Sequence, residues 1–105
     1  MNPQRQLRQV RLETNIVNEF KLNADAFVVD ISELFDEVVT QFLTEHKHKK
    51  ITYLSQPKEI PVTNVRLLPS VLEKAEERAN QDKHSVPNLL YTAFMWYAKK
   101  NQFTI

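Results

Sequence analysis

This chain overlies itself without a gap when it is shifted by 55 residues, and this duplication limits the folds available to it. The segment QVRLETNIVNEF at 9–20 aligns with NVRLLPSVLEKA at 64–75, and DISELFDEVVTQFL at 30–43 aligns with SVPNLLYTAFMWYA at 85–98. Few aligned residues are identical, but the apolar pattern recurs in both copies. The sequence therefore predicts two copies of one small unit.

Each copy begins with alternating residues that indicate a strand and continues with helical spacing. Residues 7–13 (LRQVRLE) alternate between two faces in the first copy, and 62–67 (VTNVRL) do so in the second. Apolar residues at helical spacing then follow in both copies. In the connection at 25–29, Phe27 is expected to pack into the core.

Four residues mark the starts of helices. Asp30, with Glu33 three residues later, forms a capping-box pattern, and the helix that follows should end near His46. Pro69 suits the first turn of a helix, and Ser85 suits the cap of the last one.

A strand of about six residues cannot satisfy its backbone groups alone, but the strands of two copies can pair. We therefore expect a mainly α fold with a two-stranded antiparallel ribbon, one face of which is covered by two pairs of helices. The expected organisation is a single domain over 1–105, with repeat 1 at 7–46, a linker at 47–60 and repeat 2 at 61–100. The two β-α-α repeats would form an intramolecular pseudo-dimer.

Composition argues against several classes of protein. The 105 residues include no cysteine and no glycine, and the formal net charge is +1. Thiolate chemistry and disulfides need cysteine, while phosphate-binding loops and nucleophile elbows need glycine. Turns should instead use Asn, Asp, His and Pro. No apolar run suits a membrane span or a signal peptide. We expect a cytoplasmic protein that is not an enzyme, with no cofactor and no small-molecule substrate.

The order strand, helix, short turn, helix resembles the ribbon–helix–helix family of Arc and MetJ repressors. The residues that carry the resemblance are VRLLP leading into the first helix and a Ser or Asp that opens the second. The resemblance covers 7–46 and 62–100, and the second copy is the more specific because the first lacks the proline. Members of the family are normally homodimers in which each chain supplies one strand, so this chain looks like two subunits fused.

In that family the ribbon enters the major groove of double-stranded DNA, and outward side chains of the strands contact base edges. The matching outward positions in this chain are Leu7, Gln9, Arg11, Val62, Asn64 and Arg66. Arg can bind guanine through two hydrogen bonds, and Asn or Gln can bind adenine in the same way. Leu and Val suit a thymine methyl group. Any half-exposed strand also carries polar residues outward, so these residues alone are weak evidence for DNA binding. Much of the support for DNA binding comes from the duplicated fold.

The resemblance also implies phosphate contacts at the N-terminus of the second helix of each unit, where N–H groups and the helix dipole favour an anion. The chain departs from the family there, because Asp30 places a carboxylate at one terminus and Pro87 removes an N–H donor at the other. Substitute contacts would come from residues that include Arg5, Arg8, Lys83, His84, Ser85 and the HKHKK segment at 46–50. The alternative is that the basic residues only keep the protein soluble.

Three further groups carry weaker signals. His46 and His48 have no third ligand nearby, so no metal site is expected. The carboxylate pairs at 36–37 and 76–77 are expected to face solvent. Met95 and Trp96 lie partly off the apolar stripe, where they would cover the linker or contact another chain.

We therefore expect a sequence-specific DNA-binding protein that acts as a transcriptional repressor or another plasmid or phage regulator. An accessory protein that marks a plasmid transfer origin for conjugation is an alternative. One ribbon covers little DNA, so self-association of neighbouring molecules on DNA is expected. An antitoxin-type interaction module would also use this fold, but the short segment after the last helix counts against it. A second alternative is a degenerate structural copy that has lost DNA binding, in keeping with the Asp30 carboxylate.

Overall fold

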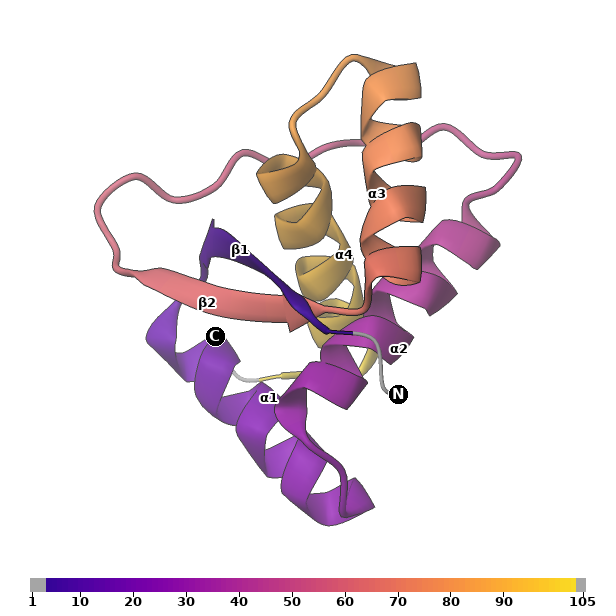
Figure 1. Ribbon diagram of the computed structural model, residues 1–105. Helices are drawn as coiled ribbons and strands as arrows, with labels where there is room; N and C mark the ends of the chain where they lie inside the picture. Colours follow the sequence, from indigo (N-terminus) through magenta and orange to yellow (C-terminus); the bar gives the residue numbers. More distant parts are fainter. Residues whose placement is uncertain (1–3, 104–105) are drawn as a thin grey trace.

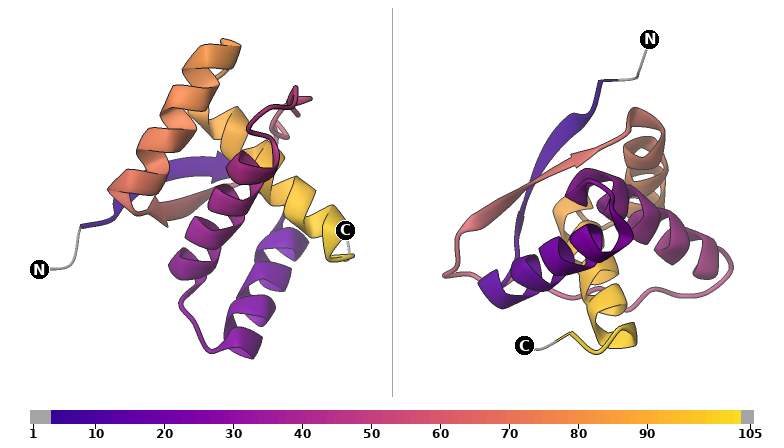
Figure 2. Two further views of the ribbon diagram at one scale, coloured as in Figure 1. Left: turned by 90° about the vertical axis from the view of Figure 1, so that its right-hand side faces the viewer. Right: turned by 90° about the horizontal axis from the view of Figure 1, so that it is seen from below.

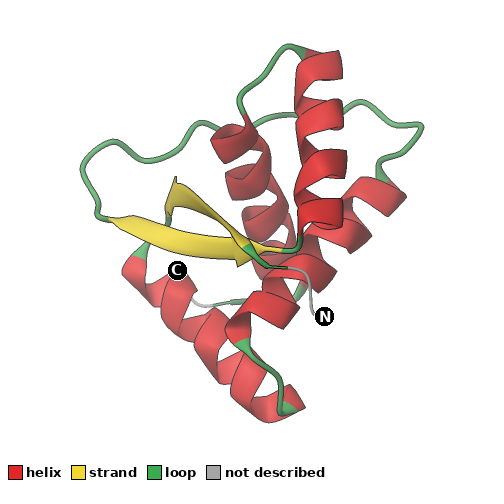
Figure 3. Cartoon of the chain, viewed as in Figure 1, coloured by secondary structure: helices red, strands yellow, loops and turns green. Residues whose placement is uncertain are grey.

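The computed structural model describes residues 4–103, which form a two-stranded antiparallel sheet and four helices (Figures 1 and 3). In chain order the elements are β1 (Gln6–Arg11), α1 (Thr14–Phe27), α2 (Ile31–Glu45), β2 (Val62–Leu67), α3 (Pro69–Asp82) and α4 (Val86–Lys100). The expectation of a mainly helical fold with one antiparallel ribbon is confirmed. No helix within 4–103 is long and apolar enough to cross a membrane.

The ribbon has one buried face and one open face. Val10, Val65 and Leu67 are fully buried, and the helices pack against this side, α2 contacting β2 and α4 contacting β1 (Figure 2). This follows from the period of two, which sends alternate side chains to opposite faces of a strand. The buried face and the apolar stripes of the helices form one continuous core.

Phe20 of α1 lies at the centre of that core. Its ring centroid is 5.1–5.7 Å from those of four other aromatic rings, which belong to Phe35, Phe94, Tyr97 and Phe103. These rings come from both halves of the chain, so the two halves share one core and neither half encloses a core of its own.

The turns between paired helices are closed by residues other than those expected. Val28 (φ 56°) ends α1 and Lys83 (φ 60°) ends α3, both in the left-handed conformation. The predicted use of Asn, Asp, His and Pro is therefore wrong at these two positions. The predicted burial of Phe27 is also wrong: α1 continues to Phe27, whose side chain is 62% exposed. The chain reverses at once through the bond from Val29 N–H to the Ala24 carbonyl at 3.0 Å, which leaves Phe27 and Val28 outside the core.

Asp36 joins α2 to the junction between β2 and α3. Its position in the helical pattern predicts solvent exposure, but this residue is only 8% exposed. Its Oδ2 accepts a hydrogen bond from the Arg5 guanidinium at 2.5 Å, and its Oδ1 accepts one from the Leu68 backbone N–H at 3.0 Å. The prediction was wrong because the periodicity of one helix does not show donors from another segment. The residue 55 positions later, Tyr91, donates to the Glu13 carboxylate at 2.7 Å at the junction between β1 and α1.

Capping of the second helices is only partly as expected. Ser85 Oγ accepts the Asn88 backbone N–H at 3.2 Å, which confirms the predicted cap of α4. Asp30 occupies the N-cap position of α2, but its side chain makes no capping hydrogen bond. The predicted capping box is therefore wrong, because the Asp30 carboxylate does not cap the helix. Asp30 is exposed to solvent.

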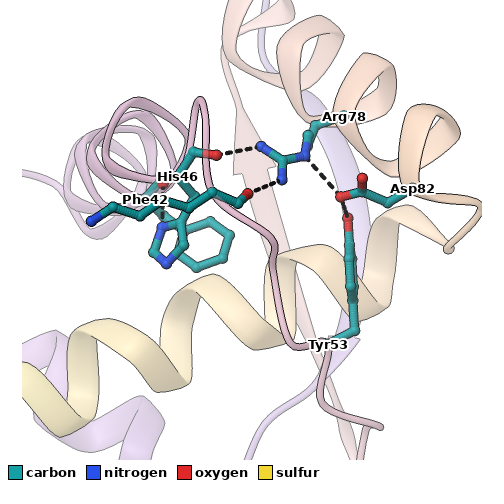
Figure 4. A network of polar contacts seen from close by, with 6 residues as sticks. Phe42, His46, Tyr53, Arg78 and Asp82 are labelled. Carbon is teal, nitrogen blue, oxygen red and sulfur yellow. Dashed lines mark hydrogen bonds and ion pairs between the residues drawn. The ribbon is translucent and has the colours of Figure 1, made fainter.

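The segment between α2 and β2 is held against α3 by a polar network (Figure 4). The Arg78 guanidinium donates to the backbone carbonyls of His46 at 2.6 Å and Lys49 at 2.7 Å. It also donates to the Asp82 carboxylate at 2.8 Å, which in turn accepts the Tyr53 hydroxyl at 2.7 Å. One arginine therefore ties the start of the linker to the last turn of α3.

The His84 ring stacks on the Tyr53 ring of this network with a centroid distance of 3.7 Å. Burial alone would raise the pKa of Asp82, but hydrogen bonds from Tyr53 and Arg78 and the charges of Arg78 and His84 hold it below its usual value. Burial, and then the neighbouring Asp82 carboxylate, raise the pKa of the Tyr53 hydroxyl. The network is thus most stable with Asp82 ionised and Tyr53 neutral.

Candidate nucleic-acid interface

The open face of the ribbon carries the six residues that the sequence predicts for base contacts. On β1 these are Leu7, Gln9 and Arg11, and on β2 they are Val62, Asn64 and Arg66. All are exposed except Arg11, which is half-buried. Both leucine and valine are more than 40% exposed, at 41% for Leu7 and 43% for Val62. The face thus combines two arginines, two amides and two aliphatic side chains.

The antiparallel register places these residues in an orderly arrangement. Gln9 pairs with Asn64 at the centre, Leu7 pairs with Arg66 on one side, and Arg11 pairs with Val62 on the other. Four residue steps separate the two outer pairs, or about 13 Å along a strand. That distance corresponds to about four base-pair steps of roughly 3.4 Å. Each end of the face therefore presents one arginine beside one aliphatic side chain.

The two central amides contact each other. Gln9 Nε2 donates to Asn64 Oδ1 at 3.4 Å, a long hydrogen bond on an exposed surface. A contact of this length between exposed groups costs little to exchange for a bond to another polar edge.

The two arginines have different surroundings. The guanidinium of Arg11 donates to the Ile60 carbonyl, and the Arg11 backbone N–H donates to Gln56 Oε1 at 2.9 Å. Arg66 is exposed, and within residues 4–103 its guanidinium has no hydrogen bond or ion pair to another residue. The linker therefore holds one arginine in place and leaves the other free to move.

The N-termini of the second helices lie at opposite ends of the ribbon. Arg5, which precedes β1, donates to the carbonyls of Ser32 in α2 at 3.4 Å and of Arg66 in β2 at 3.3 Å. At the other end, Gln56 accepts from Arg11 and donates from its Nε2 to Asn88 Oδ1 in α4 at 3.2 Å. The start of α2 thus adjoins one end of the ribbon, and the start of α4 adjoins the other.

The residues predicted for phosphate contacts are placed unevenly. The Arg5 guanidinium is engaged with Asp36, and their side chains are only 26% and 12% exposed, so Arg5 serves the fold. Arg8 donates to the neighbouring Leu7 carbonyl at 2.8 Å and is half-buried. Three more residues, Lys83, His84 and Ser85, follow one another in the turn before α4 and are exposed.

Neither helix N-terminus offers an open row of donors to an anion. At α4, Pro87 has no N–H and the Asn88 N–H is taken by Ser85 Oγ. At α2, the exposed Asp30 and Glu33 carboxylates stand where a phosphate would approach. An anion site is therefore weakened at both ends, at α4 because N–H donors are missing or already used and at α2 because the carboxylates repel an anion.

Two residues of this region are absent from the sequence-based prediction. Gln56 and Ile60 lie in the linker and contact Arg11 only because the linker runs beside β1. No periodicity or motif marks them, so the sequence offers no signal by which to find them. His46, considered as a metal ligand, instead contacts the Phe42 carbonyl through Nδ1 at 2.9 Å. Among residues 4–103 no three His, Asp or Glu side chains are grouped to hold a metal ion.

Comparison with known protein families, with characterised proteins and with solved structures found no match to this chain. The geometry of the ribbon is therefore the basis for a functional assignment.

Proposed function

We propose that this chain is a single-chain ribbon–helix–helix protein that reads the major groove of double-stranded DNA with the open face of its ribbon. The observation that carries the proposal is the row of six residues on that face, in which arginine and amide side chains point away from the core. A purely solubilising face has no need for the same residue types at matching positions of two paired strands.

The regular spacing of the elements supports two equivalent units. The bounds of α1 (14–27) and α3 (69–82) differ by 55 residues at both ends, as do those of α2 (31–45) and α4 (86–100). The two residues at the centre of the ribbon, Gln9 and Asn64, are also 55 positions apart. In a two-fold arrangement equivalent residues pair with each other at the centre, so this pairing supports the proposal of a pseudo-dimer.

The chemistry of each outward residue suits a base edge. The fork of an arginine guanidinium matches the two acceptors of guanine, and an amide matches the donor and acceptor of adenine. Leu7 and Val62 suit thymine methyl groups. Because Gln9 and Asn64 differ in length and Arg11 is held by the linker whereas Arg66 is free, we expect an imperfect palindrome as the target.

On this proposal the protein acts in the cytoplasm as a transcriptional repressor or another plasmid or phage regulator, with a conjugation accessory role as the alternative. Because the N-termini of α2 and α4 are poor anion sites, we expect the protein to hold DNA phosphates only modestly. The remaining candidates for phosphate contacts are Arg8, Lys83 and His84. Affinity should therefore depend strongly on the base contacts, and cooperation between neighbouring molecules would add to it.

The experiment is selection of binding sites from random-sequence DNA, followed by titration of the selected site with Arg11→Ala, Arg66→Ala and Arg66→Lys variants. Loss of one bidentate contact should weaken specific binding by about 1–3 kcal/mol, or roughly 5- to 150-fold. Arg66→Lys keeps the charge but not the fork, so it should lose discrimination between sites while retaining affinity for random DNA.

Lys74→Ala is the matched control, because Lys74 is an exposed cation on α3, away from the ribbon face. It should leave the preference among sites unchanged. A wild-type protein without sequence preference, or arginine variants that bind the selected site like wild type, would contradict the proposal.

A further inference from the structure

The turn between α1 and α2 carries an exposed apolar knob, which we define as Phe27 and Val28. Their exposed fractions are 62% and 90%, and the exposed carboxylates of Asp25 and Asp30 flank them in the chain. Val28 also adopts φ 56°, a conformation that is costly for a β-branched residue and would suit Gly or Asn better. Neither core packing nor turn geometry explains an apolar pair at this position.

A groove at the other end of α2 has complementary properties. Its lining includes the apolar residues Leu54, Met95 and Trp96 and two exposed lysines, Lys50 and Lys99. Trp96 is half-buried, and its ring packs edge-on against Phe42 at 5.6 Å, so the groove is part of the folded surface. We call it the lysine-rimmed groove.

At both surfaces the two copies of the repeat carry residues of different character. The residues 55 positions after the knob are Asp82 and Lys83, and the residues 55 positions before Met95 and Trp96 are Thr40 and Gln41. In each case one copy is apolar and the other polar. At the second of the two turns, the linker residue Tyr53 packs on the chain through Asp82 and His84, whereas the knob lies exposed.

The knob cannot reach the groove of its own molecule. The knob lies in the turn before α2, and the groove is lined by Phe42 near the other end of that helix, so about 18 Å of helix separates them. Contact between two knobs is opposed by the carboxylates on both, and contact between two grooves is opposed by the lysines. Apolar complementarity and opposite charge are satisfied together only when the knob of one copy meets the groove of another.

We propose that copies of this chain associate head to tail, with Phe27 and Val28 of one molecule seated in the lysine-rimmed groove of the next. Asp25 and Asp30 then face Lys50 and Lys99 across the rim. Such a contact is heterologous, so it leaves a free knob and a free groove at the two ends and allows open chains of molecules. The contact forms between proteins alone and does not rest on DNA binding.

The test is sedimentation velocity over a wide range of protein concentrations, without DNA, for wild type and two charge-reversed variants. Variant one is Asp25→Lys with Asp30→Lys, and variant two is Lys50→Glu with Lys99→Glu. Each alone should associate at least about tenfold more weakly than wild type, while an equimolar mixture should recover association because opposite charges face each other again. All four positions are exposed, so folding should survive the changes, and circular dichroism checks this.

Lys58→Glu with Lys74→Glu is the matched control for variant two, since it makes the same change in net charge at positions outside both surfaces. It should associate like wild type. A wild-type protein that stays monomeric at every concentration overturns the proposal. So does association that survives both reversals, because a symmetric or purely apolar dimer would behave in that way. DNA binding is not involved in any of these readouts, so failure here leaves the proposed DNA-binding function untouched.

Discussion

Replacing Asp36 by alanine is the perturbation that most directly tests how the two halves of this chain are joined. The residue is 8% exposed, and its carboxylate receives the Arg5 guanidinium on one oxygen and the Leu68 backbone N–H on the other. Asp36→Ala therefore leaves a cation and a backbone donor without their acceptor at the β2–α3 junction.

The expected cost follows from these two contacts. Removing one partner of a fully buried ion pair costs about 3–5 kcal/mol, but the Arg5 side chain is 26% exposed and can regain water, so this part should be closer to about 1 kcal/mol. The Leu68 backbone N–H loses its acceptor, the largely buried Asp36 carboxylate, and this loss adds about 1–2 kcal/mol to the cost. We expect a total destabilisation of about 2–3 kcal/mol.

The assay is urea denaturation of four proteins: wild type, Asp36→Ala, Arg5→Ala and the double variant. The cycle should show a coupling of about 1 kcal/mol between Asp36 and Arg5, since the double variant cannot lose their contact twice. Glu37→Ala is the neighbouring control on an exposed position and should cost within about 0.5 kcal/mol. If Asp36→Ala is no more destabilising than Glu37→Ala, the carboxylate does not join the halves as described.

Three further predictions concern the turn, the linker and the response to pH. Val28→Asn should raise the free energy of unfolding by about 1 kcal/mol in urea denaturation, because asparagine tolerates φ 56° better than valine does. Arg78→Ala should lower the free energy of unfolding by about 2–3 kcal/mol, because three hydrogen bonds donated by a side chain that is only 13% exposed are lost. Limited proteolysis should then cut the linker faster in this variant than in wild type. Burial first, and then their carboxylate partners, raise the pKa of Tyr53 and Tyr91 above the ordinary value of 10.0. The two tyrosines should contribute fully to stability below pH 10 and less above it, because they ionise at lower pH in the unfolded chain than in the folded one. When denaturation midpoints are measured against pH, the Tyr53→Phe variant should show a smaller decline than wild type.

The elements of the fold were predictable because each depends on local pattern. The alternation at Val10 and Val65 identified the ribbon face correctly, and the cap at Ser85 and the helix end near His46 were predicted from residue type and position. The failures have a different physical origin. The burial of Asp36 depends on donors that arrive from distant segments, which no periodicity encodes.

The same holds for the candidate site. Which residues point outward from the ribbon follows from a period of two, so the six outward positions were predicted from the sequence. The state of each side chain was not. Arg5 has the charge expected of a phosphate ligand, but its guanidinium is paired with Asp36. The Arg11 guanidinium donates to the Ile60 carbonyl of the linker. Charge alone cannot distinguish a cation that is free for a ligand from one whose guanidinium is used, in part or in full, by contacts within the fold.

The linker adds to the sequence differences between the two halves of the chain. It holds Arg11 through Ile60 and Gln56, while Arg66 on the other strand remains free. Its Tyr53 packs at the turn after α3, while the equivalent turn after α1 keeps its apolar knob exposed. A symmetric dimer of separate chains has no such segment and must present both halves alike. The packed linker thus gives this molecule two unequal ends, which suits both the proposed imperfectly palindromic DNA target and the proposed head-to-tail contact.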